Sequence, residues 1–225
     1  MQDALRHEPD AKSATLICRI GCIRASGKGG GGPFVSQPQE HESQIHGSLV
    51  EVAGVGVLIL GRSGVGKSEC VIELVRRGQR LVADDVVRLR VDDGAILGWA
   101  PPHIRHFIEV RGLGLMNVAD LFGEQATLER CAVGFVVRLE SVAKGKQFER
   151  IGFEREFETL LGVAVPKVRL PVHAASNLAT LVELAIRDWE LRLQGINAAE
   201  RLDERLRAEG GILRDAAGND EGEGR

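Results

Sequence analysis

Residues 61–68 read Gly61-Arg62-Ser63-Gly64-Val65-Gly66-Lys67-Ser68 and match the pattern G-x-x-x-x-G-K-[ST] at every fixed position. They follow the apolar run 55–60, which predicts a buried strand. Apolar residues then recur at helical spacing through residue 75, and Gly78 is placed to end that helix. This order of strand, glycine-rich turn and helix is typical of a phosphate-binding loop. The alternative is a turn of the same shape that binds nothing, and the agreement of all three parts argues against it.

The residue types in this loop suit a nucleotide triphosphate. Its glycines allow the backbone to curl so that N–H groups point at phosphate oxygens, and the following helix offers the positive end of its dipole. Lys67 would place a charge on the β- and γ-phosphates, and the Ser68 hydroxyl would ligate Mg²⁺. We therefore predict that residues 61–68 bind the nucleotide, with ATP and Mg²⁺ as cofactors.

Composition limits the partners. The 225 residues carry a net charge of −3, which predicts neither a nucleic-acid groove nor a basic membrane-binding face. The four cysteines are too few and too scattered for a disulfide framework, as expected for a reducing compartment. The apolar stretch 16–23 is interrupted by Arg19 and is far shorter than the roughly 20 residues of a membrane helix. We expect a soluble, cytoplasmic protein.

The rest of the chain alternates between strand-like and helix-like stretches. Periodicity predicts further strands at 48–52, 79–83, 86–91, 96–100, 132–139 and 165–172, and helices at 153–161, 178–193 and 198–209. An Asp-Gly turn at 92–94 would join two of the strands. So many strands and a hairpin favour an α/β fold in which a mixed β-sheet surrounds the phosphate loop and helices flank it.

Three regions follow from the same pattern. Residues 1–44 contain a glycine run and a polar run that bury little apolar surface, so we expect a flexible N-terminal leader. Residues 45–195 would form the folded core. Residues 196–225 would form a charged helix followed by a disordered tail.

Several charged residues outside the loop could take part in chemistry. Asp84 and Asp85 end a predicted strand, where a carboxylate could hold the water shell of Mg²⁺ or accept a proton, although such a pair can simply form a turn. Glu109 lies in an apolar, glycine-rich segment and needs either solvent or a charge partner. His46 and Arg150, judged alone, would more often be surface residues.

A resemblance to a known family makes functional roles for these residues more plausible than the residues alone do. The segments that carry it are 45–47, the phosphate loop, 77–78 with 81–85, the segment Ile108-Glu109-Val110-Arg111-Gly112-Leu113-Gly114-Leu115-Met116-Asn117-Val118, and 161–167. In this order, over about two-thirds of the chain, they resemble the bacterial HPr kinase/phosphorylase family. The resemblance implies that 45–195 is a catalytic domain that transfers phosphoryl from ATP to a serine of the phosphocarrier protein HPr, in the control of carbon metabolism. It also implies an Mg²⁺-dependent homo-oligomer, typically a hexamer.

The resemblance assigns roles to single positions. It implies catalytic roles for His46, Lys67, Asp84 and Arg150, and metal ligation by Ser68 and Glu109. Asp84 would accept the proton of the serine hydroxyl, while Lys67, Mg²⁺ and Arg150 would stabilise charge on the moving phosphoryl group. His46 would help to keep Asp84 in the correct protonation state.

The chain departs from the family pattern in two places. Longer members carry an N-terminal domain, whereas here about 44 low-complexity residues precede the core, as expected for a short form. Residues 171–177 read Pro-Val-His-Ala-Ala-Ser-Asn, where the family usually has Pro-Val-Arg-Pro-Gly-Arg-Asn and uses the loop in dephosphorylation. Neither His173 nor Ser176 can replace an arginine that binds phosphate through two parallel hydrogen bonds. We therefore predict kinase activity with weak or absent phosphorylase activity.

Two other functions stay open. One is a related kinase that acts on another protein or on a small hydroxylated metabolite, because the loop motifs do not encode the acceptor. The other is a regulatory module that binds ATP without turning it over. The presence together of five polar site residues argues against this module: His46, Lys67, Asp84, Glu109 and Arg150.

Overall fold

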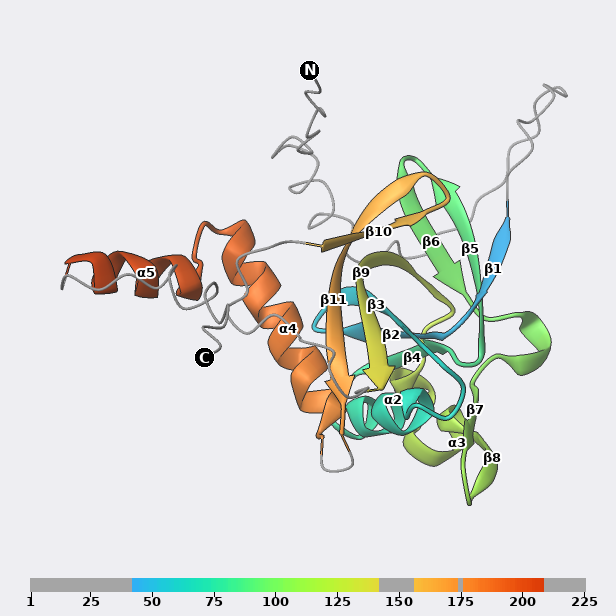
Figure 1. Ribbon diagram of the computed structural model, residues 1–225. Helices are drawn as coiled ribbons and strands as arrows, with labels where there is room; N and C mark the ends of the chain where they lie inside the picture. The colour runs from blue at the N-terminus through green and yellow to red at the C-terminus, as the bar shows by residue number, and fades with distance from the viewer. Residues whose placement is uncertain (1–41, 142–155, 174–175, 209–225) are drawn as a thin grey trace, which may run out of the picture.

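The computed structural model of the protein describes residues 42–141, 156–173 and 176–208. Within them, a mixed nine-stranded sheet runs in the order β1-β5-β6-β9-β3-β2-β4, with β11 joined to β9 and β10 to β11. Strands β3 and β11 run parallel to β9, and the remaining pairs are antiparallel. The sheet curls, and helices flank it (Figure 1). The predicted α/β fold with a mixed sheet is confirmed.

The elements follow the chain in a simple order. The strands are β1 (Ser43–His46), β2 (Ser48–Val52), β3 (Val55–Gly61), β4 (Arg80–Ala83), β5 (Val86–Asp92), β6 (Ala95–Trp99), β7 (Phe107–Val110), β8 (Gly114–Asn117), β9 (Arg130–Ser141), β10 (Glu156–Leu160) and β11 (Val163–Val172). The helices are α2 (Lys67–Arg76), α3 (Val118–Phe122), α4 (Leu178–Leu193) and α5 (Ala198–Ala208), with short 3-10 helices η1 (Pro102–Ile104) and η2 (Glu124–Ala126).

Strand β3 is apolar throughout because it is buried on both faces. Val57 and Ile59 join a core that also contains residues of α2, α4 and the β7–β8 hairpin. Leu58 and Leu60 point the other way, into a second core built mainly from the strands of the curled sheet. Since side chains alternate along a strand, one continuous apolar run supplies both cores. The phosphate loop therefore begins at the end of a strand that is buried on both faces.

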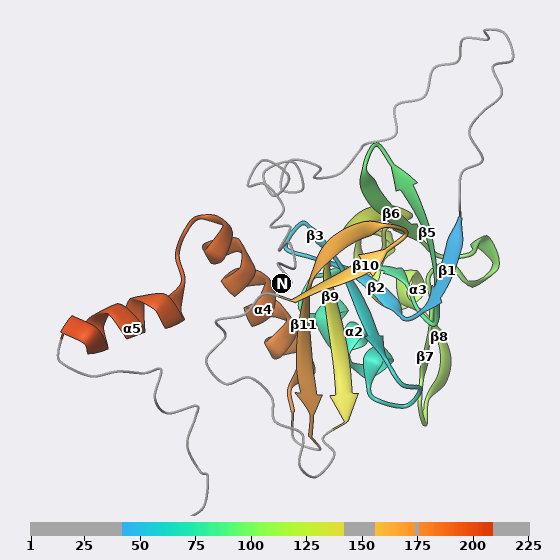
Figure 2. The ribbon, with the colours of Figure 1, turned by 45° about the horizontal axis from the view of Figure 1, so that its top comes forward.

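Helices α2 and α4 cover one face of the sheet. Helix α2 lies against the sheet next to the hairpin β7–β8, α4 lies beside β11, and α5 projects away from the sheet in both views (Figures 1 and 2). Gly78 ends α2 as predicted, with a positive φ of 89° and hydrogen bonds from its own N–H to Val75 O and from Gln79 N to Leu74 O. None of the described helices is long and apolar enough to cross a membrane.

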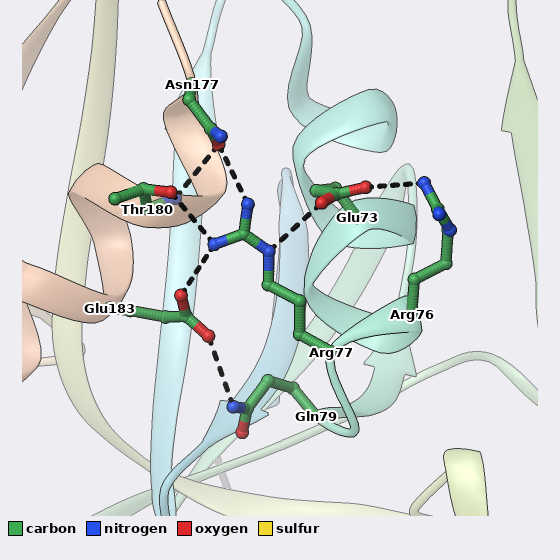
Figure 3. Close-up of polar contacts among 7 residues, drawn as sticks. All are labelled: Glu73, Arg76, Arg77, Gln79, Asn177, Thr180 and Glu183. Carbon is green, nitrogen blue, oxygen red and sulfur yellow. Dashed lines mark hydrogen bonds and ion pairs between the residues drawn. The ribbon is translucent and has the colours of Figure 1, made fainter.

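Arg77 joins the end of α2 to the start of α4 (Figure 3). Its Nε donates to Glu73 on the same helix at 3.0 Å, and its Nη1 donates to Thr180 at 2.9 Å and to Glu183 at 2.8 Å. Its Nη2 donates to Asn177 Oδ1 at 3.2 Å, and that oxygen also caps α4 by accepting from the Thr180 N–H. The guanidinium thus fixes the position of α4 relative to the phosphate-loop helix.

Several sequence predictions need correction or fall outside the described residues. The helix predicted at 153–161 is wrong: its described part forms strand β10, which pairs with β11 across the turn Leu161-Gly162. Strand β1 begins at Ser43, slightly before the expected end of the leader at residue 44. Helix α4 has the predicted bounds 178–193, and α5 confirms the charged helix after residue 196. Residues 1–41 of the leader and the tail from 209 lie outside the described residues.

Gly56 allows β3 and β9 to approach each other, which can be tested with a matched substitution. A β-carbon at Gly56 would lie 2.1 Å from the backbone oxygen of Ala132, whereas one at Gly98 would meet side-chain methyl groups only, the nearest being Leu49 Cδ2 at 2.5 Å. A backbone atom cannot move aside as a side-chain methyl group can. We expect Gly56→Ala to lower the free energy of unfolding by ~3 kcal/mol and Gly98→Ala by ~1 kcal/mol in urea titrations. Equal losses would contradict this account of the pairing.

Candidate active site

The phosphate loop connects β3 to α2 and holds Lys67 at its end. Gly64 and Gly66 adopt φ values of 75° and 101°, in the left-handed region that glycine adopts without strain. Gly66 is the N-cap of α2 and provides no side-chain cap, so the positive end of the helix dipole faces the loop. Lys67 is only 7% exposed, and its Nζ donates to the backbone oxygens of Gly61 at 3.0 Å and Arg62 at 3.3 Å. The loop therefore suits an anion.

A buried carboxylate lies beside the loop. Asp84 follows the last residue of β4 and is 5% exposed. Its Oδ2 accepts a hydrogen bond from Ser68 Oγ at 2.9 Å, and its Oδ1 accepts one from Ser48 Oγ at 2.6 Å. Two hydroxyls from β2 and α2 therefore fix both carboxylate oxygens. Sequence reasoning missed Ser48, because its partner Asp84 lies 36 positions away in the chain.

Burial raises the pKa of the Asp84 carboxyl, because the charged form loses hydration inside the protein. Hydrogen bonds from Ser48 and Ser68, and from the backbone N–H groups of Glu109 and Asp85, oppose this effect but do not cancel it. A carboxylate with a raised pKa, anchored at both oxygens, is well suited to accept and return a proton.

His46 joins Lys67 to the second aspartate. Its Nε2 lies 3.2 Å from Lys67 Nζ and its Nδ1 lies 3.1 Å from Asp85 Oδ1. Because an ammonium group can only donate, Nε2 accepts the hydrogen bond and the proton is on Nδ1. His46 therefore contacts Lys67 and Asp85, and its predicted influence on the protonation state of Asp84 stays a prediction. Asp85 adopts a φ of 66°, and its backbone oxygen accepts from Gly47 N at 3.1 Å, which holds this turn beside β1.

Both predicted metal ligands, Ser68 and Glu109, lie beside Asp84. Ser68 contacts the carboxylate through its hydroxyl and Glu109 through its backbone N–H, while the Glu109 side chain is exposed. Among the described residues, no three His, Cys, Asp or Glu side chains cluster closely enough to bind a metal by themselves. The Ser68 hydroxyl and the Glu109 carboxylate are oxygen ligands of the kind that Mg²⁺ takes together with phosphate oxygens and water. Arg150 lies outside the described residues.

An open cleft of about 530 Å³ adjoins the phosphate loop. His46, Gly61 and Arg62 line its loop side. Apolar side chains of β1, β3, the loop and β9 line the remainder, together with three polar residues at the end of β9; these lining residues are Ile45, Leu60, Val65, Leu139, Arg138, Glu140 and Ser141. A cleft with an anion-binding end and an apolar wall fits a nucleotide.

The strand, loop and helix, with a buried carboxylate beside the lysine, define a phosphate-loop domain of the kind that performs phosphoryl-transfer chemistry. The chain belongs to the family of the HPr Serine kinase C-terminal domain, which matches residues 39–206.

Named relatives agree with this membership. The chain is 47% identical over 174 residues to the HPr kinase/phosphorylase of Bacillus licheniformis, covering 77% of this chain and 56% of the relative. It is 45% identical over 163 residues to that of Bacillus subtilis, covering 72% and 53%. The chain thus spans about half the length of the curated relatives it matches. The solved Hpr(Ser) kinase/phosphatase from Coxiella burnetii superposes with a TM-score of 0.64 at 30% identity, covering 68% of this chain and 93% of that one.

The raised pKa of Asp84 predicts how stability depends on pH. The folded-state pKa lies above that of the unfolded chain, so the ionised carboxylate destabilises the fold above this pKa, and the penalty disappears as the pH falls below both values. Asp84→Asn removes the charge with little change of shape. We expect a gain of ~1 kcal/mol in the free energy of unfolding at pH 8 that shrinks toward pH 4.

Urea titrations at both pH values measure this difference. Asp85→Asn is the matched control, because its side chain is 69% exposed and an asparagine also adopts positive φ. A gain for Asp84→Asn that is independent of pH, or no gain at pH 8, would contradict the assignment.

Proposed function

We propose that this protein is an ATP- and Mg²⁺-dependent serine kinase that phosphorylates the phosphocarrier protein HPr. The observation that carries the proposal is the pair of hydrogen bonds from Ser48 and Ser68 to the buried Asp84, next to Lys67 in the phosphate loop. The names of the relatives, HPr kinase/phosphorylase and Hpr(Ser) kinase/phosphatase, supply the acceptor and the type of residue that is modified.

The chain's own residues would divide the work as follows. The N–H groups of the loop and Lys67 would bind the phosphates of ATP, whose base would occupy the apolar part of the cleft. The acceptor serine oxygen forms a bond to the γ-phosphorus as the bond to the ADP oxygen breaks, and Asp84 accepts the serine proton. Lys67 and Arg150 would stabilise the charge on the transferred group. Mg²⁺, held by Ser68 and Glu109, would neutralise charge on the β- and γ-phosphates.

Exposed leucines near the site favour a protein acceptor over a small metabolite. Leu115 lies directly opposite Glu109 in the β7–β8 pairing and is 68% exposed, and Leu113 at the tip is 74% exposed. Such side chains beside a predicted metal ligand can be covered by a protein surface, whereas a small hydroxylated compound would leave them in water. This supports HPr or another protein as the substrate.

We also propose that the protein works in the cytoplasm, where ATP is available, and that it forms a homo-oligomer, by family resemblance a hexamer. Exposed apolar side chains on α4 and α5, at Leu184, Leu191 and Leu202, support self-association.

The reverse reaction, phosphate-driven dephosphorylation, should be weak. In the loop before α4, the His173 N–H donates to Ser176 Oγ and the Ser176 N–H donates to His173 O, both at 3.0 Å. The Ser176 hydroxyl is thus used within the loop, and no guanidinium stands at either position to bind phosphate through two parallel hydrogen bonds.

Labelled ATP tests the proposal. With γ-labelled ATP, Mg²⁺ and purified HPr, the protein should transfer label to an HPr serine. Asp84→Asn should slow transfer by ~10³-fold or more, because the hydroxyl proton has no acceptor, while ATP affinity changes less than about threefold. Lys67→Met is the contrasting variant and should weaken ATP binding itself.

Two outcomes would contradict the proposal. Tight ATP binding without label transfer to HPr would favour another acceptor or the regulatory module. Loss of ATP binding in a folded Asp84→Asn variant would remove the catalytic role of that residue. The same preparation, given phospho-HPr and inorganic phosphate, should release phosphate far more slowly than it transfers label; rapid release would overturn the proposal that the altered loop weakens the reverse reaction.

A further inference from the structure

The roles assigned above do not explain why the charged residue Arg111 lies where it does. It follows β7 in the turn that leads to β8, where Leu113 N donates to Val110 O at 3.0 Å and Gly112 adopts a φ of 88°. Its side chain is exposed to solvent. Among the described residues, no carboxylate forms an ion pair with it.

The guanidinium of Arg111 lies directly on the phosphate loop. A β-carbon added at Gly64 would be 2.8 Å from Arg111 Nη2 and 3.4 Å from its Cζ. The φ of 75° at Gly64 suits glycine, and a side chain at this position would also displace the guanidinium from the loop. This cation lies close to a phosphate-binding loop and has no carboxylate partner among the described residues. It can therefore bind an anion held in that loop.

The same hairpin also contacts the catalytic carboxylate. The Glu109 backbone N–H donates to Asp84, and Arg111 stands two positions further along the chain. The hairpin thus reaches the proton acceptor with one residue and the phosphate loop with the other. A γ-phosphate bound by the loop and an acceptor hydroxyl that gives its proton to Asp84 would both be near this hairpin.

We propose that Arg111 is a further catalytic residue, which binds the γ-phosphoryl group and stabilises its charge during transfer. This rests on the proposed function of the site. Lys67 supplies a point charge, whereas the planar guanidinium of Arg111 can donate to two oxygens of the transferred group at once. The charge in phosphoryl transfer is spread over those oxygens, so the two cations act on different parts of it.

Nucleotide binding distinguishes this role without any acceptor protein. Calorimetric titrations with Mg²⁺ and either ADP or the non-hydrolysable analogue AMP-PNP should be compared for the parent, Arg111→Ala and Arg111→Lys. We expect Arg111→Ala to weaken AMP-PNP binding about tenfold or more and ADP binding less than about threefold, because only the analogue carries a γ-phosphoryl group. For Arg111→Lys, the loss of AMP-PNP affinity should lie between that of the parent and that of Arg111→Ala.

Leu113→Ala is the matched control, since it alters the same turn without removing a cation. It should leave both affinities and their ratio unchanged, and the urea midpoint of every variant should equal that of the parent. Equal losses for ADP and AMP-PNP, no loss for either, or the same loss in Leu113→Ala would overturn the proposal. If HPr accepted no label while AMP-PNP still depended on Arg111, the acceptor assignment would fail and this inference would stand.

Discussion

The structure depends on one buried carboxylate and the two hydroxyls that hold it. Ser48 on β2 and Ser68 on α2 both donate to Asp84 at the end of β4, so three elements far apart in the sequence meet at one side chain. Burial raises the pKa of Asp84, and the hydrogen bonds keep it in place. Burying a carboxylate lowers the stability of the fold, and such a loss is typical of sites where a raised proton affinity serves function. In the proposed reaction, this group receives the serine proton.

Helix α2 is fixed at both ends, which explains how the loop before it keeps its geometry. At its start, Ser68 is bound to Asp84; at its end, Arg77 donates to residues of α4. Leu178, the first residue of α4, would lie 3.5 Å from a β-carbon at Gly66, so α4 also packs against the loop. The cleft beside the phosphate loop, the Asp84 carboxylate and the start of α4 therefore belong to one connected framework, and the β7–β8 hairpin brings Glu109 and Arg111 to it.

The sequence predicted the parts of the fold that depend on local pattern. The phosphate loop, Gly78 at the end of α2 and the bounds of α4 all follow from glycine positions, caps and periodicity. Residues 153–161 were predicted to form a helix, yet 156–160 pair with β11, a contact that no local signal encodes. Ser48 and Arg111 were missed for the same reason: their partners, Asp84 and Gly64, lie 36 and 47 positions away in the chain. The catalytic role of His46 stays a prediction, and its contacts with Lys67 and Asp85 could be identified only in three dimensions.

The central claim is that the γ-phosphate lies between the loop lysine and the buried aspartate. A crystal structure of the protein with Mg²⁺ and AMP-PNP tests it most directly. The account predicts the γ-phosphoryl group within hydrogen-bond distance of Lys67 Nζ, with the Asp84 carboxylate on the side open to the acceptor. A nucleotide bound away from residues 61–68, or a γ-phosphoryl group separated from Asp84 by the body of the loop, would contradict it.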